Sequence, residues 1–438
     1  MFTDSIVRLL SRRFTLAAAR LLLGAALTAG SVAIAFAAPD RTWVATWGAS
    51  PQSEVEPIFG PPPPPVVFEN QSIRMVARIS KGGERIRVRL DNSQGTEPVV
   101  IGAAHVALHA TGSSTVPGTD RVLTFGGRPS VTLPPGAPLL SDPVALPVAD
   151  LTELAVSIYL PNSTAALNGH TLGVQTTYLT AQGAGDQTAY PGFNAAQTTL
   201  VRYYLSGIEV TSARDTSAIV TFGDSITDGF SSTIDANRRW PDRLAERLLS
   251  GGPKRHTWHR EDLSVVNAGI SGNRLLHHVI GPDALSRFDR DVLATTGAGY
   301  AVVMLGINDV GFSAIQVPNS PFATQAVTSD QMIQAYRQLI ARAHARGIKI
   351  FGATLTPFEG AGYATPEGEA KRQAANAFIR SAGEFDGVID FDRATRDPAR
   401  PTRLRPEYDS GDHLHPNDAG YEAMANAVDL SLFRSGSR

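Results

Sequence analysis

The second half of the chain, from about residue 215, alternates between apolar, strand-like runs and stretches of helical length. The apolar runs are "AIVTFG" at 218–223, "LSVVNAGI" at 263–270, "YAVVMLG" at 300–306, "IKIFGATLTP" at 348–357 and "VIDF" at 388–391. Helical stretches occupy 331–346, 366–383 and 418 to about 430. This alternation predicts a parallel sheet covered by helices on both faces. Ligands of such sheets bind at the carboxyl ends of the strands, so chemistry is sought just after each apolar run.

The first half has a different period. From Trp43 to about Tyr204 the strand-like runs are "SIRMVARIS", "ERIRVRLDN", "VVIGAAHVALHA", "LAVSIYLP" and "LGVQTTYLT", separated by Gly, Pro and Asn. In "RIRVRL" at 85–90, apolar residues alternate with arginines, which is typical of a strand with one buried face. The pattern predicts an all-β sandwich. The run "PPPPP" at 61–65 cannot join a central strand and is expected to form an exposed polyproline II loop or linker.

The N-terminus has the features of an export signal. Four arginines precede or open the apolar run "LLLGAALTAGSVAIAFAA", which contains an Ala-x-Ala pattern at 35–37. We therefore expect a signal peptide at 1–37, a β-rich domain at 38–214 and an α/β domain at 215–438, in a secreted or periplasmic protein. A retained membrane anchor is the alternative, since the run is close to the lower length for a membrane span. The choice between general and twin-arginine export stays open.

Charge and cysteine content exclude several classes of function. Removal of residues 1–37 takes away four Arg and one Asp, so the balance of basic and acidic residues moves from 39 against 41 to 35 against 40. A mildly acidic chain without a basic stripe argues against nucleic acid or an anionic membrane surface as a partner. The absence of cysteine excludes disulfides, a thiol nucleophile and thiolate metal sites. We expect no cofactor, and the oligomeric state cannot be read from this sequence.

Three residues with complementary chemistry follow the predicted strands, and two more lie near the C-terminus. They are Ser225 in "GDSITDG", Gly272 in "NAGISGN", Asn308 in "GIND", and Asp412 and His415 in "DHLHP". Ser225 would attack an ester carbonyl, His415 would take and return its proton, and Asp412 would orient the imidazole. The backbone N–H groups of Ser225 and Gly272 and the side-chain amide of Asn308 would form the oxyanion hole.

Each of these signals has a plainer interpretation. Gly272 and Asn308 are also common turn residues after a strand. His413 and Asp409 are rivals of His415 and Asp412, less favoured because His413 adjoins Asp412 and because Asp409 must reach across a glycine-containing loop. What favours the catalytic interpretation is that every component is present, in order, at the expected ends of the predicted elements.

The four sequence blocks resemble those of the SGNH hydrolases, also called GDSL esterases and lipases. The resemblance covers residues 218 to about 430, and the whole chain is similar to secreted bacterial members with an N-terminal β domain. It implies a three-layer α/β/α fold of flavodoxin type and a carboxylic ester hydrolase. The family's serine, glycine, asparagine and histidine correspond to Ser225, Gly272, Asn308 and His415, and its aspartate to Asp412.

The substrate is less well defined by the sequence. The long segments at 228–240 and 310–331 are expected to form pocket walls, with apolar surface from Phe230, Phe312 and Phe358. We expect short-chain acyl esters, including acetyl groups on sugars, with a lipase or lysophospholipase as the alternative. Arg238 and Arg239 are assigned structural roles. The aromatic pair Trp43 and Trp47 in "TWVATWG" is expected to pack in the core rather than to stack on sugars.

Two further classes stay open. One is a non-catalytic carbohydrate-binding protein, whose β half would be the binding module. The other is a metalloenzyme, given ten histidines, although the pairs His277 with His278 and His256 with His259 lack a carboxylate at a recognised ligand spacing.

Overall fold

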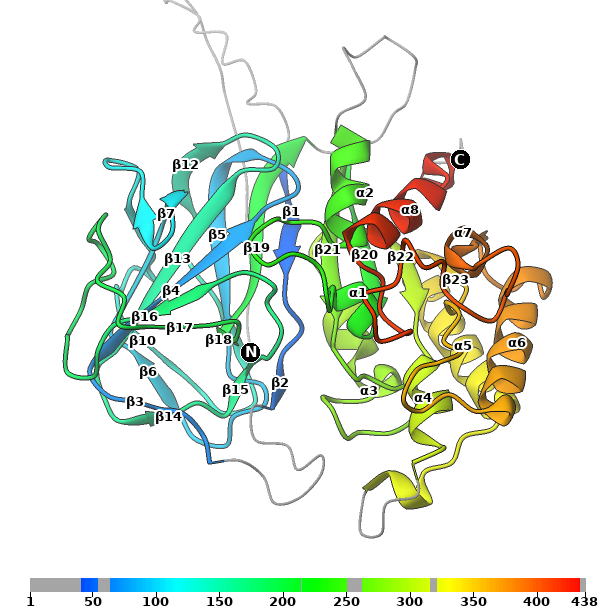
Figure 1. Ribbon diagram of the computed structural model, residues 1–438. Helices are drawn as coiled ribbons and strands as arrows, with labels where there is room; N and C mark the ends of the chain where they lie inside the picture. The colour runs from blue at the N-terminus through cyan, green and yellow to red at the C-terminus, as the bar shows by residue number, and fades with distance from the viewer. Residues whose placement is uncertain (1–40, 54–63, 214, 250–261, 316–320, 434–438) are drawn as a thin grey trace, which may run out of the picture. The chain divides into compact units, whose positions relative to one another are not determined.

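The computed structural model describes residues 41–53, 64–213, 215–249, 262–315 and 321–433 (Figure 1). The predicted signal peptide and most of the "PPPPP" run lie outside these residues. Residues Pro39–Arg438 form one compact unit. The boundary predicted at 214/215 falls between strand β19 (Leu205–Ala213) and strand β20 (Thr216–Gly223). Because contacts across it join both regions into this unit, the division into two domains stays a prediction.

The first region is built from antiparallel strands, as predicted. One sheet has the order β1-β19-β5-β11, with β12 also on β5, and another has the order β17-β16-β4-β13-β7-β8, with β9 on β7. Their strands are β1 (Arg41–Gly48), β4 (Gln71–Arg78), β5 (Gly83–Asp91), β7 (Ala103–Thr111), β8 (Ser114–Thr115), β9 (Arg121–Val122), β11 (Pro138–Leu140), β12 (Val144–Val148), β13 (Glu153–Leu160), β16 (Thr177–Leu179) and β17 (Gln197–Thr199). Shorter pairings involve β2 (Gln52–Ser53), β3 (Val67–Phe68), β6 (Val99–Ile101), β10 (Val131–Leu133), β14 (Thr164–Ala165), β15 (Asn168–His170) and β18 (Arg202–Tyr203).

A shared hydrophobic core holds the two larger sheets together. Ile86, Val88 and Leu90 of β5 are fully buried in the same cluster as the apolar residues of β4 and β13. The arginines that alternate with them point the other way, where Arg87 and Arg89 pair with Glu209 at 2.5 and 2.8 Å. The two-residue period of "RIRVRL" therefore separates core from ion pairs, which confirms the predicted sandwich-like packing.

Some strand boundaries and faces differ from the predictions. The run at 99–110 is two strands, β6 and β7, separated at Gly102, where a Cβ atom would lie 2.7 Å from the Tyr159 ring. Only Thr177–Leu179 of the run at 172–180 is a strand. Trp47 is buried, but a register shift between Ala45 and Trp47 interrupts the alternation that would place it on one face with Trp43. Trp43 instead carries the guanidinium of Arg87 over its ring, 4.3 Å from the centroid.

The second region contains a five-stranded parallel sheet with the order β21-β20-β22-β23-β24. In chain order this is 2-1-3-4-5, the arrangement of flavodoxin-like folds. The remaining strands are β21 (Asp262–Gly269), β22 (Ala298–Met304), β23 (Lys349–Ala353) and β24 (Gly387–Ile389). All five predicted apolar runs are strands of this sheet, which confirms the predicted fold class.

Helices cover both faces of the sheet (Figure 1). The helical segments are α1 (Ser225–Asp228), α2 (Trp240–Leu249), α3 (Ala284–Phe288), the π-helical turn η1 (Asp289–Leu293), α4 (Ile307–Phe312), η2 (Pro321–Thr324), α5 (Ser329–His344), α6 (Pro366–Ser381), α7 (Phe391–Thr395), α8 (Asp418–Ala427) and η3 (Leu430–Phe433). Helices α2, α7 and α8 contact one another, as do α3, α4, α5 and α6 in pairs. On one face Phe222 packs edge-on against Phe288 of α3, and on the other Tyr300 and Phe351 pack against Phe433.

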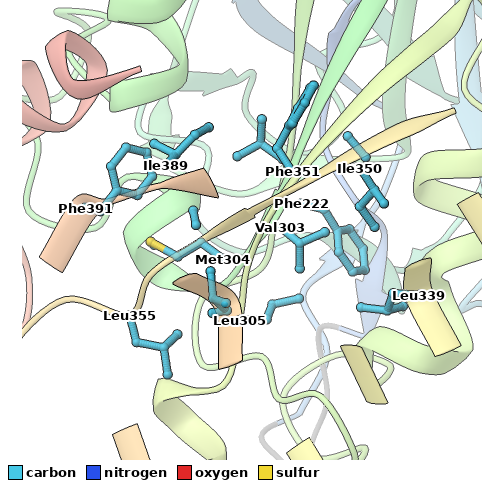
Figure 2. Packing of buried hydrophobic residues seen from close by; sticks show 14 of the residues in the cluster. Phe222, Val303, Met304, Leu305, Leu339, Ile350, Phe351, Leu355, Ile389 and Phe391 are labelled. Atoms are coloured by element: carbon cyan, nitrogen blue, oxygen red, sulfur yellow. The ribbon is translucent and has the colours of Figure 1, made fainter. Parts of the chain in front are cut away.

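The core of this region is a continuous apolar layer on each side of the strands. Figure 2 shows Val303 and Met304 of β22 with Ile350 and Phe351 of β23, and Leu339 of α5. All these side chains are at most 2% exposed. Rigid packing of this kind fixes the strand ends that carry the candidate site. Within the part of the chain that the structure describes, every helix is too short or too polar to traverse a lipid bilayer.

Candidate active site

Ser225 is placed at the carboxyl end of the central strand β20. It is the first residue of the short helix α1, and the preceding Asp224 caps this helix by accepting a hydrogen bond from the N–H of Ile226 at 3.1 Å. Burial raises the pKa of Asp224 to about 7. The Ser225 hydroxyl lies 2.8 Å from Nε2 of His415, although the two residues are 190 positions apart in the chain. The sheet edge therefore brings a hydroxyl and an imidazole within proton-transfer distance.

The other ring nitrogen of His415 faces a carboxylate. Nδ1 lies 2.6 Å from Oδ2 of Asp412, while Oδ1 of Asp412 accepts hydrogen bonds from the N–H groups of Leu414 and His415 at 2.9 and 2.8 Å. Partial burial acts to raise the pKa of Asp412, but the hydrogen bonds from His415 and Leu414 outweigh it and hold this pKa well below its usual value. Asp412 is therefore a charged acceptor that can fix the tautomer of His415.

The rival residues form a separate pair. His413 Nδ1 lies 2.6 Å from Oδ2 of Asp409, and the His413 side chain is 52% exposed, against 10% for His415. His413 also has a φ of +62°, in the left-handed region. Of the two histidine–aspartate pairs in this loop, only His415 with Asp412 reaches Ser225.

Gly272 occupies a position that a side chain would disturb. Its φ is +77°, and a Cβ atom here would lie 2.6 Å from Cδ1 of Ile280. Both observations require glycine, because other residues are strained in the left-handed region and would also meet Ile280. The loop after β21 can therefore pass close to Ser225 and present backbone there.

Asn308 lies in the first turn of α4, after β22. Its Nδ2 donates to the carbonyl of Asn273 at 3.0 Å, and its Oδ1 accepts from the hydroxyl of Tyr363 at 3.2 Å. Burial raises the pKa of Tyr363 well above its usual value, so that hydroxyl keeps its proton and remains a donor. These two partners fix which way the amide faces.

A buried arginine, Arg287, holds together the segments that surround Asn308. Arg287 donates to the carbonyls of Gly223 and Ala268, both at 2.8 Å, and to Oδ1 of Asn273 at 2.9 Å. Its charge is paired with Asp291 at 2.9 Å. The guanidinium thus connects the ends of strands β20 and β21 with the residue that orients Asn308.

Four of the five predicted residues line one cavity, and the fifth, Asp412, contacts His415 in its wall. The cavity has a volume of ≈490 Å³, and Ser225, Gly272, Asn308 and His415 line it directly. Much of the remaining wall is apolar, with side chains from Leu172, Phe230, Ile280, Phe312, Tyr363 and Leu414. The Phe230 ring lies 4.4 Å from the His415 ring, centroid to centroid. Volume and lining are those of a small-molecule site.

Two predictions about neighbouring residues can be compared with the structure. Phe230 and Phe312 line it as predicted, but Phe358 does not, because it is 1% exposed and belongs to the hydrophobic core behind Tyr363. Arg238 pairs with Asp418 at 3.2 Å and Arg239 with Asp242 at 2.8 Å, in agreement with structural roles.

No group of three or more potential metal ligands occurs among the described residues. His277 and His278 belong to this part of the chain, whereas His256 and His259 lie outside it.

The sequence left the role of the β region open between glycan binding, a wall for the catalytic cleft and stabilisation alone, and it pointed to none of the residues that form this wall. Gln52 and Ser53 of β2, and Thr171 and Leu172 after β15, form part of its wall. His170 reaches Asp228 of the first motif at 2.9 Å. Nothing in the sequence pointed to a contact between Asp228 and His170, which is 55 positions before Ser225.

A scan against family models matches residues 221–423 to the GDSL-like Lipase/Acylhydrolase family. The C-terminal half of this chain is a GDSL-like lipase/acylhydrolase domain. The protein is therefore a carboxylic ester hydrolase, and the antiparallel β region precedes its GDSL domain.

The GDSL domain is also similar to solved structures. One is a putative lipolytic protein of the G-D-S-L family from Desulfitobacterium hafniense, with 20% identity over 48% of this chain and 97% of that chain, and a TM-score of 0.36. An acetyl xylan esterase from Geobacillus stearothermophilus has 22% identity over 51% and 97%, with a TM-score of 0.38. A lipase/acylhydrolase from Enterococcus faecalis has 20% identity over 48% and 92%, with a TM-score of 0.35. No curated protein matches the chain.

Proposed function

We propose that this esterase uses Ser225 as its nucleophile, His415 as general base and acid, and Asp412 as the residue that orients His415. The observation that carries the proposal is the unbroken chain of contacts from the Ser225 hydroxyl through His415 to Asp412, at 2.8 and 2.6 Å, beside an apolar cavity. A hydroxyl is a weak nucleophile until a base takes its proton, and this base stands at hydrogen-bond distance.

The reaction would proceed in two halves. Ser225 Oγ attacks the ester carbonyl while Nε2 of His415 takes its proton, and the protonated imidazole then gives that proton to the departing alcohol. A water molecule, activated by the same nitrogen, hydrolyses the acyl-enzyme and releases the acid. Throughout, the carboxylate of Asp412 stabilises the charge that His415 gains.

The negative charge on the carbonyl oxygen needs donors, and we assign these to the N–H groups of Ser225 and Gly272 and to Nδ2 of Asn308. One Nδ2 hydrogen is used by the Asn273 carbonyl, and an amide nitrogen carries a second one. The contacts of Asn308 with Asn273 and Tyr363 hold the amide in place before the charge develops, which is what makes such donors effective.

Substitution of Asn308 by alanine should lower kcat by about 10²-fold or more and change KM little, because the donor acts mainly on the transition state. Steady-state hydrolysis of an aryl ester measures both constants. The melting temperature provides the control for folding, and an unchanged kcat in a folded variant would remove Asn308 from the oxyanion hole.

For the substrate, we propose esters of short acyl chains, including acetyl groups carried by sugars. An alternative is a longer acyl chain of the lipase or lysophospholipase type, and the apolar walls formed by Phe230, Ile280 and Phe312 favour it. Rates on p-nitrophenyl esters from acetate to palmitate, together with acetylated glycans, decide between them. We expect kcat/KM to peak at short chains, and a maximum at palmitate would establish the alternative.

We also propose that the enzyme acts outside the cytoplasm, after removal of residues 1–37. The support is the arginine-led apolar run with its Ala-x-Ala pattern. Mass spectrometry of the exported protein tests this proposal, since an intact N-terminus would contradict it.

A further inference from the structure

We infer that His170, a residue of the N-terminal β region, is a positioning residue for the loop that carries the oxyanion donor Gly272. It acts through Asp228, which holds Ser271 next to that glycine. The inference rests on the proposed function, because the position of Gly272 matters to the reaction only if its N–H group binds the oxyanion.

The contacts of His170 fix the position of its ring. Its Nδ1 lies 3.0 Å from the carbonyl oxygen of Ser50, and its Nε2 lies 2.9 Å from Oδ1 of Asp228 and 3.1 Å from the carbonyl oxygen of Leu172. Both ring nitrogens of His170 therefore face oxygen atoms at hydrogen-bond distance. His170 is 4% exposed, so its contact with Asp228 is a buried hydrogen bond between an imidazole nitrogen and a carboxylate oxygen.

Asp228 connects His170 to the loop that contains Ser271 and Gly272, which we call the oxyanion loop. It is the last residue of α1 and is 1% exposed. While Oδ1 faces His170, Oδ2 accepts from the backbone N–H of Ser271 at 3.0 Å and from its hydroxyl at 2.8 Å. A buried carboxylate with two donors on one oxygen and the His170 ring on the other has one favourable orientation. Ser271 is consequently tied to a fixed point three residues beyond Ser225.

The fixed position of Ser271 also determines the orientation of the peptide bond between Ser271 and Gly272. Gly272 has a left-handed backbone and lies against Ile280. Its N–H group belongs to the peptide bond with Ser271, so the position of Ser271 determines the direction in which this group points. An oxyanion donor must be placed to within a fraction of an ångström, and errors of about 1 Å can cost ~10²-fold in rate. His170 thus supplies, from a different sheet, the rigidity that a loop after β21 lacks by itself.

The test compares His170→Gln and Ser271→Ala with a matched control, Arg78→Gln. Arg78 also connects the β region to the GDSL domain, through Glu246 of α2 at 2.7 Å and the carbonyl of Asn237 at 3.3 Å. In the described structure, neither partner forms a hydrogen bond with Ser271 or Gly272. We expect His170→Gln to lower kcat by about 10-fold or more with little change in KM, and Arg78→Gln to leave kcat unchanged. Melting temperatures report any loss of stability in each variant.

A double-mutant cycle tests the route of the effect. If His170 acts through Asp228 on Ser271, the loss of kcat in the double variant His170→Gln/Ser271→Ala is smaller than the product of the single losses. The effects of His170→Gln and Arg78→Gln should instead multiply. Asp228→Asn, which keeps the shape of the side chain but removes its charge, replaces His170→Gln in this cycle if the latter does not fold.

The outcomes separate this inference from the proposed function. The inference is overturned if the folded His170 or Asp228 variant keeps the wild-type kcat, or if its loss multiplies with that of Ser271→Ala. In either case the proposed function stands as long as the wild-type protein hydrolyses esters and Ser225→Ala does not.

Discussion

Replacement of Ser225 by alanine should lower kcat for an aryl ester by on the order of 10⁶-fold, as loss of the nucleophilic serine does in subtilisin. The physical reason is that the hydroxyl 2.8 Å from His415 is the atom expected to bond to the carbonyl carbon. The small residual rate would come from the donors that remain, Gly272 and Asn308, which still bind a developing oxyanion.

The protein should remain folded after this change, because the side chain loses one atom at the edge of a cavity and no core contact. An unchanged melting temperature, together with an unchanged KM, would support that expectation. A fluorophosphonate reagent gives a second readout, since it should add to the Ser225 peptide of the wild-type protein and not to the variant. Hydrolysis at the wild-type rate in Ser225→Ala would rule out this nucleophile.

Replacement of Asp412 by asparagine should cost about 10⁴-fold in kcat, through the wrong tautomer of His415. The side-chain carbonyl of asparagine can keep the hydrogen bonds from the N–H groups of Leu414 and His415, so the loop is expected to persist. The amide N–H₂ would then face Nδ1 of His415. It would favour the proton on Nε2, where the ring can no longer accept the proton of Ser225.

The neighbouring pair provides the control for this experiment. His413 and Asp409 lie in the same loop at the same 2.6 Å separation, but outside the contact chain to Ser225. We expect His413→Ala to keep the wild-type kcat within a small factor. If Asp412→Asn were as active as His413→Ala, the orienting role of Asp412 would be wrong.

The sheet and the residues at its strand ends were predictable for one physical reason. Parallel strands buried on both faces must be apolar, so any polar residue directly after them is conspicuous. Ser225, Gly272 and Asn308 stand in such positions, and the structure places all three around one cavity. The sequence limited the choice of the catalytic histidine to the two in the "DHLHP" segment, and the spacing from Asp412 favoured His415 over His413.

The remaining features depend on distances between segments far apart in the chain. The contact of His170 with Asp228 and the contribution of Gln52 and Leu172 to the cavity wall have no local pattern, since each arises from how the β region packs on the GDSL domain. Phe358 shows that a local pattern can also predict a pocket residue that tertiary packing does not place there. Its position after a strand predicted a pocket side chain, but tertiary packing directs it into the core.

Part of the cavity wall is formed by residues of the β region, namely Gln52, Ser53, Thr171 and Leu172. In a hydrolase with one domain, the same domain would hold both the reacting groups and the whole cavity wall. The proposed reacting groups lie in one part of the sequence, and part of the wall that a bound ester would contact comes from another part that contains none of them. Exchange of the N-terminal half between related enzymes is therefore expected to change which ester is accepted, and to preserve kcat only where a histidine in the place of His170 still contacts Asp228.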